Sequence, residues 1–168
     1  LAWLIGCTLG FSQPVFINEF LASNTVGATD ENGQHDDWLE LFNASNNPMD
    51  IGGMYLTDDL GQPTKWKIPD TNPTKTTIAP GGFLLFWLDG EPVQGVLHAN
   101  FKLGAGGEDI GLFDAAGNRV DGLSFGPQTA NISFGRSSDG GSDFQFFINP
   151  TPLASNGGTA GGSFAEAP

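Results

Sequence analysis

The residues best suited to chemistry lie in one acidic loop that carries four oxygen donors. They are Asp30, Asn32, Asp36 and Asp37, placed around a glycine turn. Carboxylate and amide oxygens are the ligands that Ca²⁺ takes in proteins. The loop is not an EF-hand, because Leu41 stands where that motif has its last glutamate. Two interpretations stay open for this loop, a calcium site and a solvated acidic surface.

Three further acidic residues, Asp58, Asp59 and Glu19, could approach this loop from neighbouring strands or loops. We expect no cofactor to be required, with calcium as an optional ligand. Thermal unfolding in calcium and in chelator separates the two interpretations, because a ligand that binds only the native state raises the unfolding midpoint.

Three candidate catalytic side chains are better explained as structural. His98 falls on the outward side of an expected strand over residues 97–103, so we expect a partly exposed structural histidine. Ser124 and Ser133 also fall in expected strands, whereas a nucleophilic serine is presented on a strained turn. The sequence therefore indicates no nucleophilic catalysis.

Glu19 and Glu40 invite comparison with the paired carboxylates of glycosidases. Both, however, fall in strands that flank the expected core. We therefore expect them to act as hydrogen-bonding or sheet-edge residues, with Arg136 or Lys102 as candidate partners.

Three tryptophans, Trp38, Trp66 and Trp87, would form a sugar-stacking platform if they were exposed. Packing in the core or at its rim is the competing explanation. Trp66 is the most open case, because a lysine flanks it on each side. We keep Trp66 as a candidate ligand-binding residue.

The charge balance excludes some classes of partner. Nineteen acidic residues against six basic ones give a net charge of -13, whereas nucleic-acid binding calls for basic patches. The single cysteine, Cys7, excludes an intrachain disulfide and a cysteine-based zinc site. We expect no nucleic-acid partner and no transmembrane helix.

The two ends of the chain differ from its middle. Residues 1–13 are apolar at first and uncharged, which is typical of the remnant of a signal peptide, with cleavage before Gln13. The alternative is a lipoprotein leader, because residues 4–7 are similar to a bacterial lipobox and would place a lipid on Cys7. Residues 157–168 are rich in small residues and are expected to form a flexible linker, which leaves residues 14–156 as the domain.

The middle of the chain predicts an all-β fold, because short apolar runs are separated by Gly- and Pro-rich turns. In the strand over residues 38–43, Leu39 and Leu41 should face one side and Trp38 and Glu40 the other. The run 83–88 is apolar on both faces and is expected to be the most buried element. No convincing helix is expected.

Several segments together carry a family pattern. In chain order they are residues 17–24, 37–43, 56–58, 66–69, 78–82, 98–103, 107–110, 133–136 and 149–152. In their order and spacing they resemble the lamin-tail domains of exported bacterial proteins. The resemblance covers about residues 15–156. It implies an immunoglobulin-like β-sandwich of Greek-key antiparallel sheets, and it carries over no catalytic residues.

The resemblance also implies a function. In bacteria such domains are accessory modules of secreted or cell-surface proteins, so we expect a non-catalytic extracellular module for protein or surface binding and for domain positioning. Its partners would be an unknown protein, a surface glycan or neighbouring domains of a larger chain. The alternative is a carbohydrate-binding module, with or without calcium as an aid to binding, attached to a secreted hydrolase.

Overall fold

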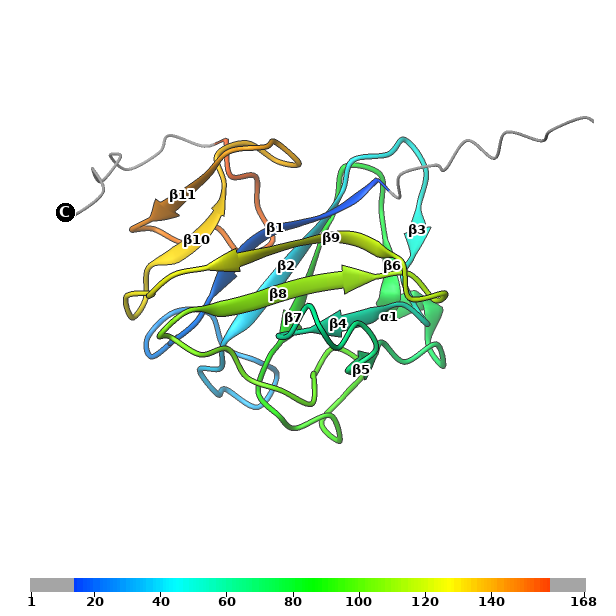
Figure 1. Cartoon of the computed structure of the whole chain (residues 1–168), viewed down its shortest axis with the longest axis horizontal. Helices are drawn as coiled ribbons and strands as arrows, with labels where there is room; N and C mark the ends of the chain where they lie inside the picture. Colours follow the sequence, from blue (N-terminus) through cyan, green and yellow to red (C-terminus); the bar gives the residue numbers. More distant parts are fainter. Residues whose placement is uncertain (1–13, 158–168) are drawn as a thin grey trace, which may run out of the picture.

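The computed structural model describes residues 14–157, so the expected leader with Cys7 and nearly all of the expected linker lie outside the described residues. Short strands and one turn of helix make up the domain (Figure 1). The elements are β1 (Val15–Leu21), β2 (Trp38–Asn43), β3 (Met49–Asp50), β4 (Tyr55–Thr57), β5 (Trp66–Lys67), α1 (Pro73–Thr76), β6 (Thr77–Ile78), β7 (Phe83–Trp87), β8 (Glu108–Phe113), β9 (Arg119–Phe125), β10 (Ser133–Arg136) and β11 (Phe144–Phe147).

Two antiparallel sheets form the layers of a sandwich. The first has the strand order β11-β10-β1-β2-β7, and the second has the order β5-β4-β8-β9. In Figure 1, β8 and β9 cross in front of β1 and β2, which shows the two layers face to face. A small third sheet pairs β3 with β6. The predicted all-β, immunoglobulin-like sandwich is thus confirmed.

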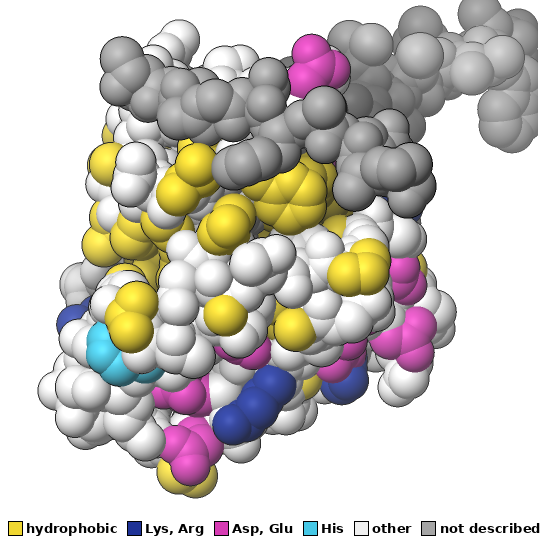
Figure 2. Space-filling model, turned by 90° about the vertical axis from the view of Figure 1, so that its left-hand side faces the viewer, with side chains coloured by type: hydrophobic (Ala, Val, Ile, Leu, Met, Phe, Trp, Pro, Cys, Tyr) yellow, Lys and Arg dark blue, Asp and Glu magenta, His cyan; other side chains and the backbone are white. Residues whose placement is uncertain are grey.

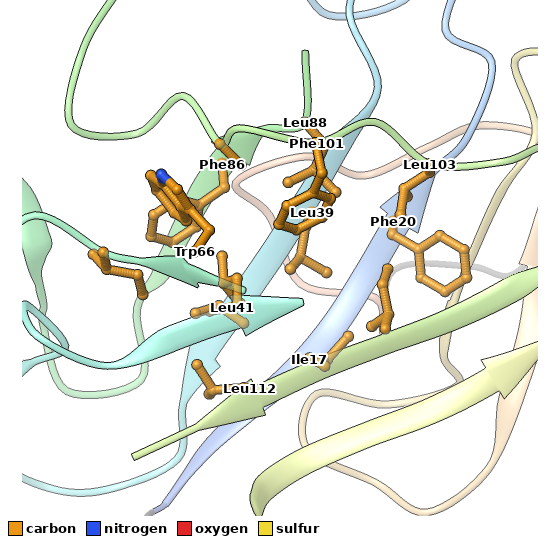
Figure 3. Close-up of a cluster of buried hydrophobic side chains, with 14 of the residues drawn as sticks. Ile17, Phe20, Leu39, Leu41, Trp66, Phe86, Leu88, Phe101, Leu103 and Leu112 are labelled. Atoms are coloured by element: carbon orange, nitrogen blue, oxygen red, sulfur yellow. The ribbon is translucent and has the colours of Figure 1, made fainter. Parts of the chain in front are cut away.

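The main core lies between these layers. Side chains of β1, β2 and β7 meet those of β5, β8 and the segment 101–103 (Figure 3). The Trp66 ring packs edge-on against Phe86 with the ring centroids 6.0 Å apart, and Phe20 contacts Phe125 at 4.6 Å. Aromatic pairs of this kind add stabilisation beyond the area that they bury.

The alternation predicted for β2 is confirmed. Leu39 and Leu41 belong to the main core, whereas Trp38 packs on the opposite face of the sheet in a second apolar cluster. That cluster also contains Leu21, Leu85 and Trp87. Ala28, in the loop between β1 and β2, packs on this second cluster. This contact helps to hold that loop against the end of the sheet.

A β-bulge in β1 shapes the same outer face. Ile17 is paired with Leu41 and Glu19 with Glu40, so Asn18 is the extra residue between the two pairs. A bulge sets two residues of one strand opposite one of its neighbour. Glu19 and Glu40 therefore lie side by side on the face that points away from the main core.

Three expectations about secondary structure need correction. The run 83–88 forms an edge strand, β7, so β1 and β2 are more deeply buried than it is. Residues 97–103 form no strand and make only two isolated bridges, to Trp87 and to Asp89. Finally, no helix was expected, but residues 73–76 form the short helix α1. It begins at a proline, which suits the first helical position because the N–H that proline lacks has no partner there.

Candidate functional site

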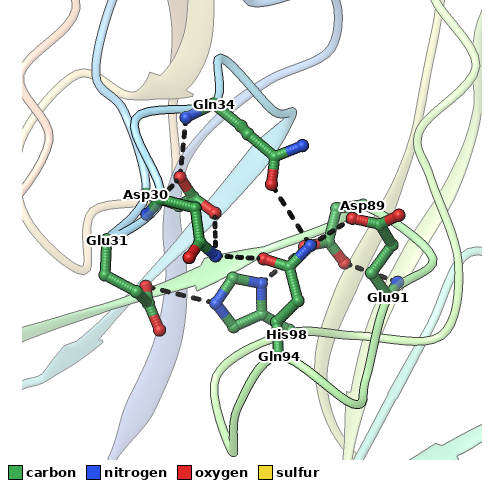
Figure 4. Close-up of polar contacts among 8 residues, drawn as sticks. Asp30, Glu31, Gln34, Asp89, Glu91, Gln94 and His98 are labelled. Carbon is green, nitrogen blue, oxygen red and sulfur yellow. Dashed lines mark hydrogen bonds and ion pairs between the residues drawn. The ribbon is translucent and has the colours of Figure 1, made fainter.

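Two loops meet at one end of the first sheet. β1 and β7 run in the same direction, because each is antiparallel to β2. The loops that follow them, residues 22–37 and 88–98, therefore emerge at the same end. Asn32 donates a hydrogen bond to Gln94 at 2.6 Å, and Gln94 donates to Gln34 at 3.2 Å. These side chains tie the two loops together (Figure 4).

His98 lies at the centre of this end and is buried, with 1% of its surface exposed. Our expectation of a partly exposed histidine is therefore wrong. Its Nδ1 lies 2.5 Å from Oδ2 of Asp89, which is also buried. Its Nε2 lies 3.2 Å from Oε2 of Glu31 but makes no well-aligned hydrogen bond. Figure 4 shows the imidazole between these two carboxylates.

The surroundings of His98 change its affinity for protons. Burial acts to lower the pKa of His98, but the carboxylates of Asp89 and Glu31 outweigh burial and raise it above the ordinary value. The imidazole therefore holds its proton more firmly than an exposed histidine does.

Asp30 is held in place by its own loop. Its Oδ1 accepts hydrogen bonds from the backbone N–H of Asn32 at 2.9 Å and of Gln34 at 2.7 Å. Burial acts to raise the pKa of Asp30, but these bonds and the Asn32 side chain lower it overall. Gly33 has a φ of +78°, a conformation that favours glycine in this tight turn. The carboxylate is thus ionised and fixed in position.

The structure separates the four predicted calcium ligands. Asn32 donates its amide hydrogens to Asp30 and Gln94. Asp37 caps the end of β1, because its Oδ1 accepts the N–H groups of Ser23 at 2.6 Å and Asn24 at 3.3 Å.

Asp36 is not among the carboxylates that come together with His98, and its Oδ2 is buried with no hydrogen bond among the described residues. Burial, then the charges of Asp89 and Asp30, raise the pKa of Asp36. The residues suggested as additional ligands have other partners: Asp58 pairs with Lys65, and Asp59 accepts from Gln62.

A different set of donors does come together. One ligand atom each from Asp30, Glu31 and His98 lie within 4.8 Å of one another. Sequence reasoning included Asp30 and missed both Glu31 and the Asp89–His98 pair. Glu31 was visible as an acidic residue in the same loop. No pattern in the sequence indicated that the loop after β7 packs against the loop after β1.

A second pair of acidic residues, Glu19 and Glu40, is buried completely. Glu19 accepts hydrogen bonds from the Ser133 hydroxyl and from Thr151, whose Oγ1 lies 2.6 Å and whose N lies 3.0 Å from its carboxylate oxygens. Glu40 accepts from the Asn18 amide at 3.0 Å and the Leu153 N–H at 2.5 Å. The expected hydrogen-bonding role is thus confirmed.

Neither Arg136 nor Lys102, the cations that we expected near these glutamates, forms an ion pair with them in the described part of the chain. Arg136 pairs with Asp121 at 2.7 Å, and no ion pair joins Lys102 to either glutamate in the described part of the chain. Burial raises the pKa of Glu40 to about 8, although its hydrogen bonds with Asn18 and Leu153 act in the opposite direction. Burial likewise raises the pKa of Glu19.

The glutamate pair lies under residues 151–153, which supply donors to both carboxylates. A glycosidase needs its carboxylates on either side of a bound sugar, and this cover fills the space where a sugar would lie. Gly135 is paired with Glu19, and a Cβ there would lie 2.7 Å from the Asn18 carbonyl oxygen and 2.9 Å from Cγ of Glu19. Glycine is required at this position for the carboxylate to fit.

The other candidate side chains are structural. Ser124 stands between Gly122 and Gly126, a spacing found in serine hydrolases, but it lies within β9 and its hydroxyl donates to Asp109 at 2.5 Å. A nucleophile elbow instead joins a strand to a helix. The three tryptophans considered as a sugar platform, Trp38, Trp66 and Trp87, are all buried.

Comparison with known proteins agrees with the observed fold. The family model described as Lamin Tail Domain matches residues 12–127, more than half of the chain. No curated protein matches the sequence. The match ends before β10 (Ser133–Arg136), so the segment that covers the glutamate pair lies outside it. In the described residues, no helix is long and apolar enough to cross a membrane. The chain belongs to the lamin tail domain family.

Proposed function

We propose that this domain is a non-catalytic accessory module of an exported protein, which binds a protein partner and positions the domains attached to it. The observation that carries the proposal is a concentration of exposed apolar side chains. Of five large hydrophobic residues that are well exposed in the described range, three lie close together in sequence: Phe146, Ile148 and Leu153. Exposed apolar patches on a folded domain mark interaction surfaces.

These residues lie on and just after the edge strand β11, a region that we call the β11 surface. Figure 2 shows hydrophobic side chains gathered on the upper half of the face that β10 and β11 occupy, whereas most acidic side chains lie on the lower half. Among the described residues, β11 pairs with β10 alone. An edge strand has unpaired backbone groups, which a partner strand can use.

The test places a photo-reactive benzoylphenylalanine at Phe146 of the parent protein in the cells that produce it. We expect one discrete cross-linked adduct, which Ile148→Asp abolishes. The control places the same group at Val93, which is 93% exposed and lies beyond β7 at the other edge of the sheet. No adduct at Phe146, or the same adducts from both positions, would contradict the proposal.

The carbohydrate-binding alternative has less support. It needs exposed, coplanar aromatic rings, whereas Trp66 is 6% exposed and packs against Phe86. Titration of the domain with cell-surface glycans is the direct test of this alternative. Saturable binding, lost on substitution of an exposed aromatic such as Phe146, would favour it over a protein partner.

A further inference from the structure

The geometry points to a binding site for a divalent transition metal, formed by Asp30, Glu31 and His98. This site lies at the loop end of the sandwich and does not depend on the partner proposed for the β11 surface. Its three donor atoms are two carboxylate oxygens and one imidazole nitrogen, all within 4.8 Å of one another. We use Zn²⁺ as the probe.

The buried histidine is the main reason for this proposal. His98 is 1% exposed, and its Nε2 has no hydrogen-bond partner among the described residues although it is directed at the Glu31 carboxylate. A buried polar atom normally has a partner. A metal ion between Nε2 and the two carboxylates would supply one.

The other ring nitrogen, Nδ1, is held by a carboxylate, as is usual in histidines that bind a metal. Nδ1 of His98 lies 2.5 Å from Asp89, whose carboxylate is buried. Metal-binding histidines generally donate their second N–H to a carboxylate or carbonyl, which orients the ring and leaves Nε2 for the metal. Asp89 is thus a positioning residue for the proposed ligand His98.

The two carboxylates differ in how they are held. Asp30 has Oδ1 occupied by two backbone N–H groups, while Oδ2 accepts only the Asn32 amide at 3.2 Å and keeps a free lone pair. The Glu31 side chain is 61% exposed, so it can move. Oε2 of Glu31 already lies 3.2 Å from Nε2 of His98. Zinc ligands lie about 2.0–2.2 Å from the metal, so donor atoms that are farther apart within the 4.8 Å limit must come closer when the metal binds.

The donor set also indicates the class of metal. Imidazole with carboxylate suits Zn²⁺ and its neighbours in the first transition row, whereas Ca²⁺ takes oxygen ligands. The protonated imidazole, bridging Asp89 and Glu31 as an ion pair, is the competing state. Metal binding must displace that proton, so the affinity should fall as the pH is lowered.

The experiment is calorimetric titration of the 168-residue chain with Zn²⁺, in a Cys7→Ser background that removes the one thiol. We expect one site, with affinity at least about 10-fold weaker in Glu31→Gln and about 10–100-fold weaker in Asp89→Asn. The matched control is Glu91→Gln, an exposed glutamate in the loop after β7. We expect its affinity to stay within about 2-fold of the parent, since Glu91 is outside the donor set.

Nitrogen NMR of the imidazoles gives a readout independent of affinity. The chain has two histidines, so His35, which is exposed, serves as the internal control. Zn²⁺ should shift the Nε2 resonance of His98 and leave His35 unchanged. Equal weakening in Glu31→Gln and Glu91→Gln, a shift at His35 alone, or Ca²⁺ binding as tightly as Zn²⁺ would each overturn the proposal.

Discussion

The two acidic clusters of this domain use the same functional groups in opposite ways. Glu19 and Glu40 are buried and meet hydroxyl, amide and backbone donors from three segments of the chain: β1, β10 and residues 151–153. The cluster at the loop end keeps an exposed carboxylate on Glu31 and a buried imidazole nitrogen on His98 without an aligned partner. The first cluster is satisfied internally, and the second has capacity left for a ligand.

This difference shows that the surrounding hydrogen-bond donors decide whether a carboxylate has a structural role or is available to a ligand. An unsatisfied buried polar group costs about 1–3 kcal/mol. The hydrogen bonds of the glutamate pair therefore stabilise the contact of residues 151–153 with the sheet. In the loop cluster, Nε2 of His98 has no hydrogen-bond partner among the described residues. Four measurements test this difference between the two clusters.

The largest effect is expected for Glu19→Ala. The substitution leaves the Ser133 hydroxyl and the two donors of Thr151 without their acceptor in a buried site. We expect the free energy of unfolding to fall by about 3 kcal/mol or more, measured by urea denaturation. Glu19→Gln keeps one acceptor oxygen and should cost less. A loss under about 1 kcal/mol for Glu19→Ala would show that the pair is not a structural tie.

The next effect is a dependence of stability on pH. Burial raises the pKa of Glu40 from 4.5 to about 8. The native state therefore binds a proton that the unfolded state releases between these values. The resulting stability is complete below about pH 4.5 and is lost as the pH rises toward 8. We expect the free energy of unfolding to drop by a few kcal/mol between pH 5 and pH 8.5.

The raised pKa of His98 acts in the same direction, but only above its ordinary value of 6.5. The interval from pH 5 to 6.5 thus reports chiefly on buried carboxyls, and Glu40→Gln should reduce the slope there. A stability that rises with pH in that interval would contradict the raised pKa of Glu40.

A smaller effect is expected for Asp37→Ala. Asp37 accepts two backbone N–H groups at the turn after β1, where Ser23 has a φ of 89°. Its loss should lower the free energy of unfolding by about 1–2 kcal/mol, equally in calcium and in chelator. Asp37→Asn keeps an acceptor oxygen and serves as the control. A loss seen only with calcium present would instead make Asp37 a ligand.

The smallest effect is expected for Glu31→Ala in chelator. The side chain is 61% exposed, and surface substitutions of this kind change stability by about 0.5 kcal/mol at most. With Zn²⁺ present, the parent protein should gain stability through binding while the variant gains less. A large loss in chelator would mean that Glu31 mainly holds His98 in place.

The class of fold could be predicted from the sequence because a half-buried strand shows alternating apolar and polar residues along a short stretch of chain. Alternation along residues 38–43 correctly assigned the faces of Leu39, Leu41 and Trp38. The edge position of β7 was not predictable, because an apolar run has the same composition whether its neighbour is another strand or a covering loop. Residues 97–103 alternate like a strand, yet they form a loop that makes isolated bridges.

The candidate site was predicted in part. The sequence located the acidic loop and Asp30, but it grouped Asp30 with Asp37, which caps the end of β1, and with Asp36, whose Oδ2 is buried without a hydrogen bond among the described residues. In extended chain, successive side chains lie on opposite sides, so neighbouring carboxylates need not share a ligand. The burial of His98 could not be predicted, because the loop that covers it comes from a distant part of the sequence.

By itself, the sequence determined the features that depend on neighbours along the chain: the all-β class, the turns, the acidic character and the family. Only the tertiary structure decided which acidic residues meet donors and which meet an imidazole. Glu19 and Glu40 are brought together by a bulge and sealed by residues 151–153. Asp89 and His98 meet Glu31 because β1 and β7 end on the same side of the sheet. Local patterns do not record such long-range contacts.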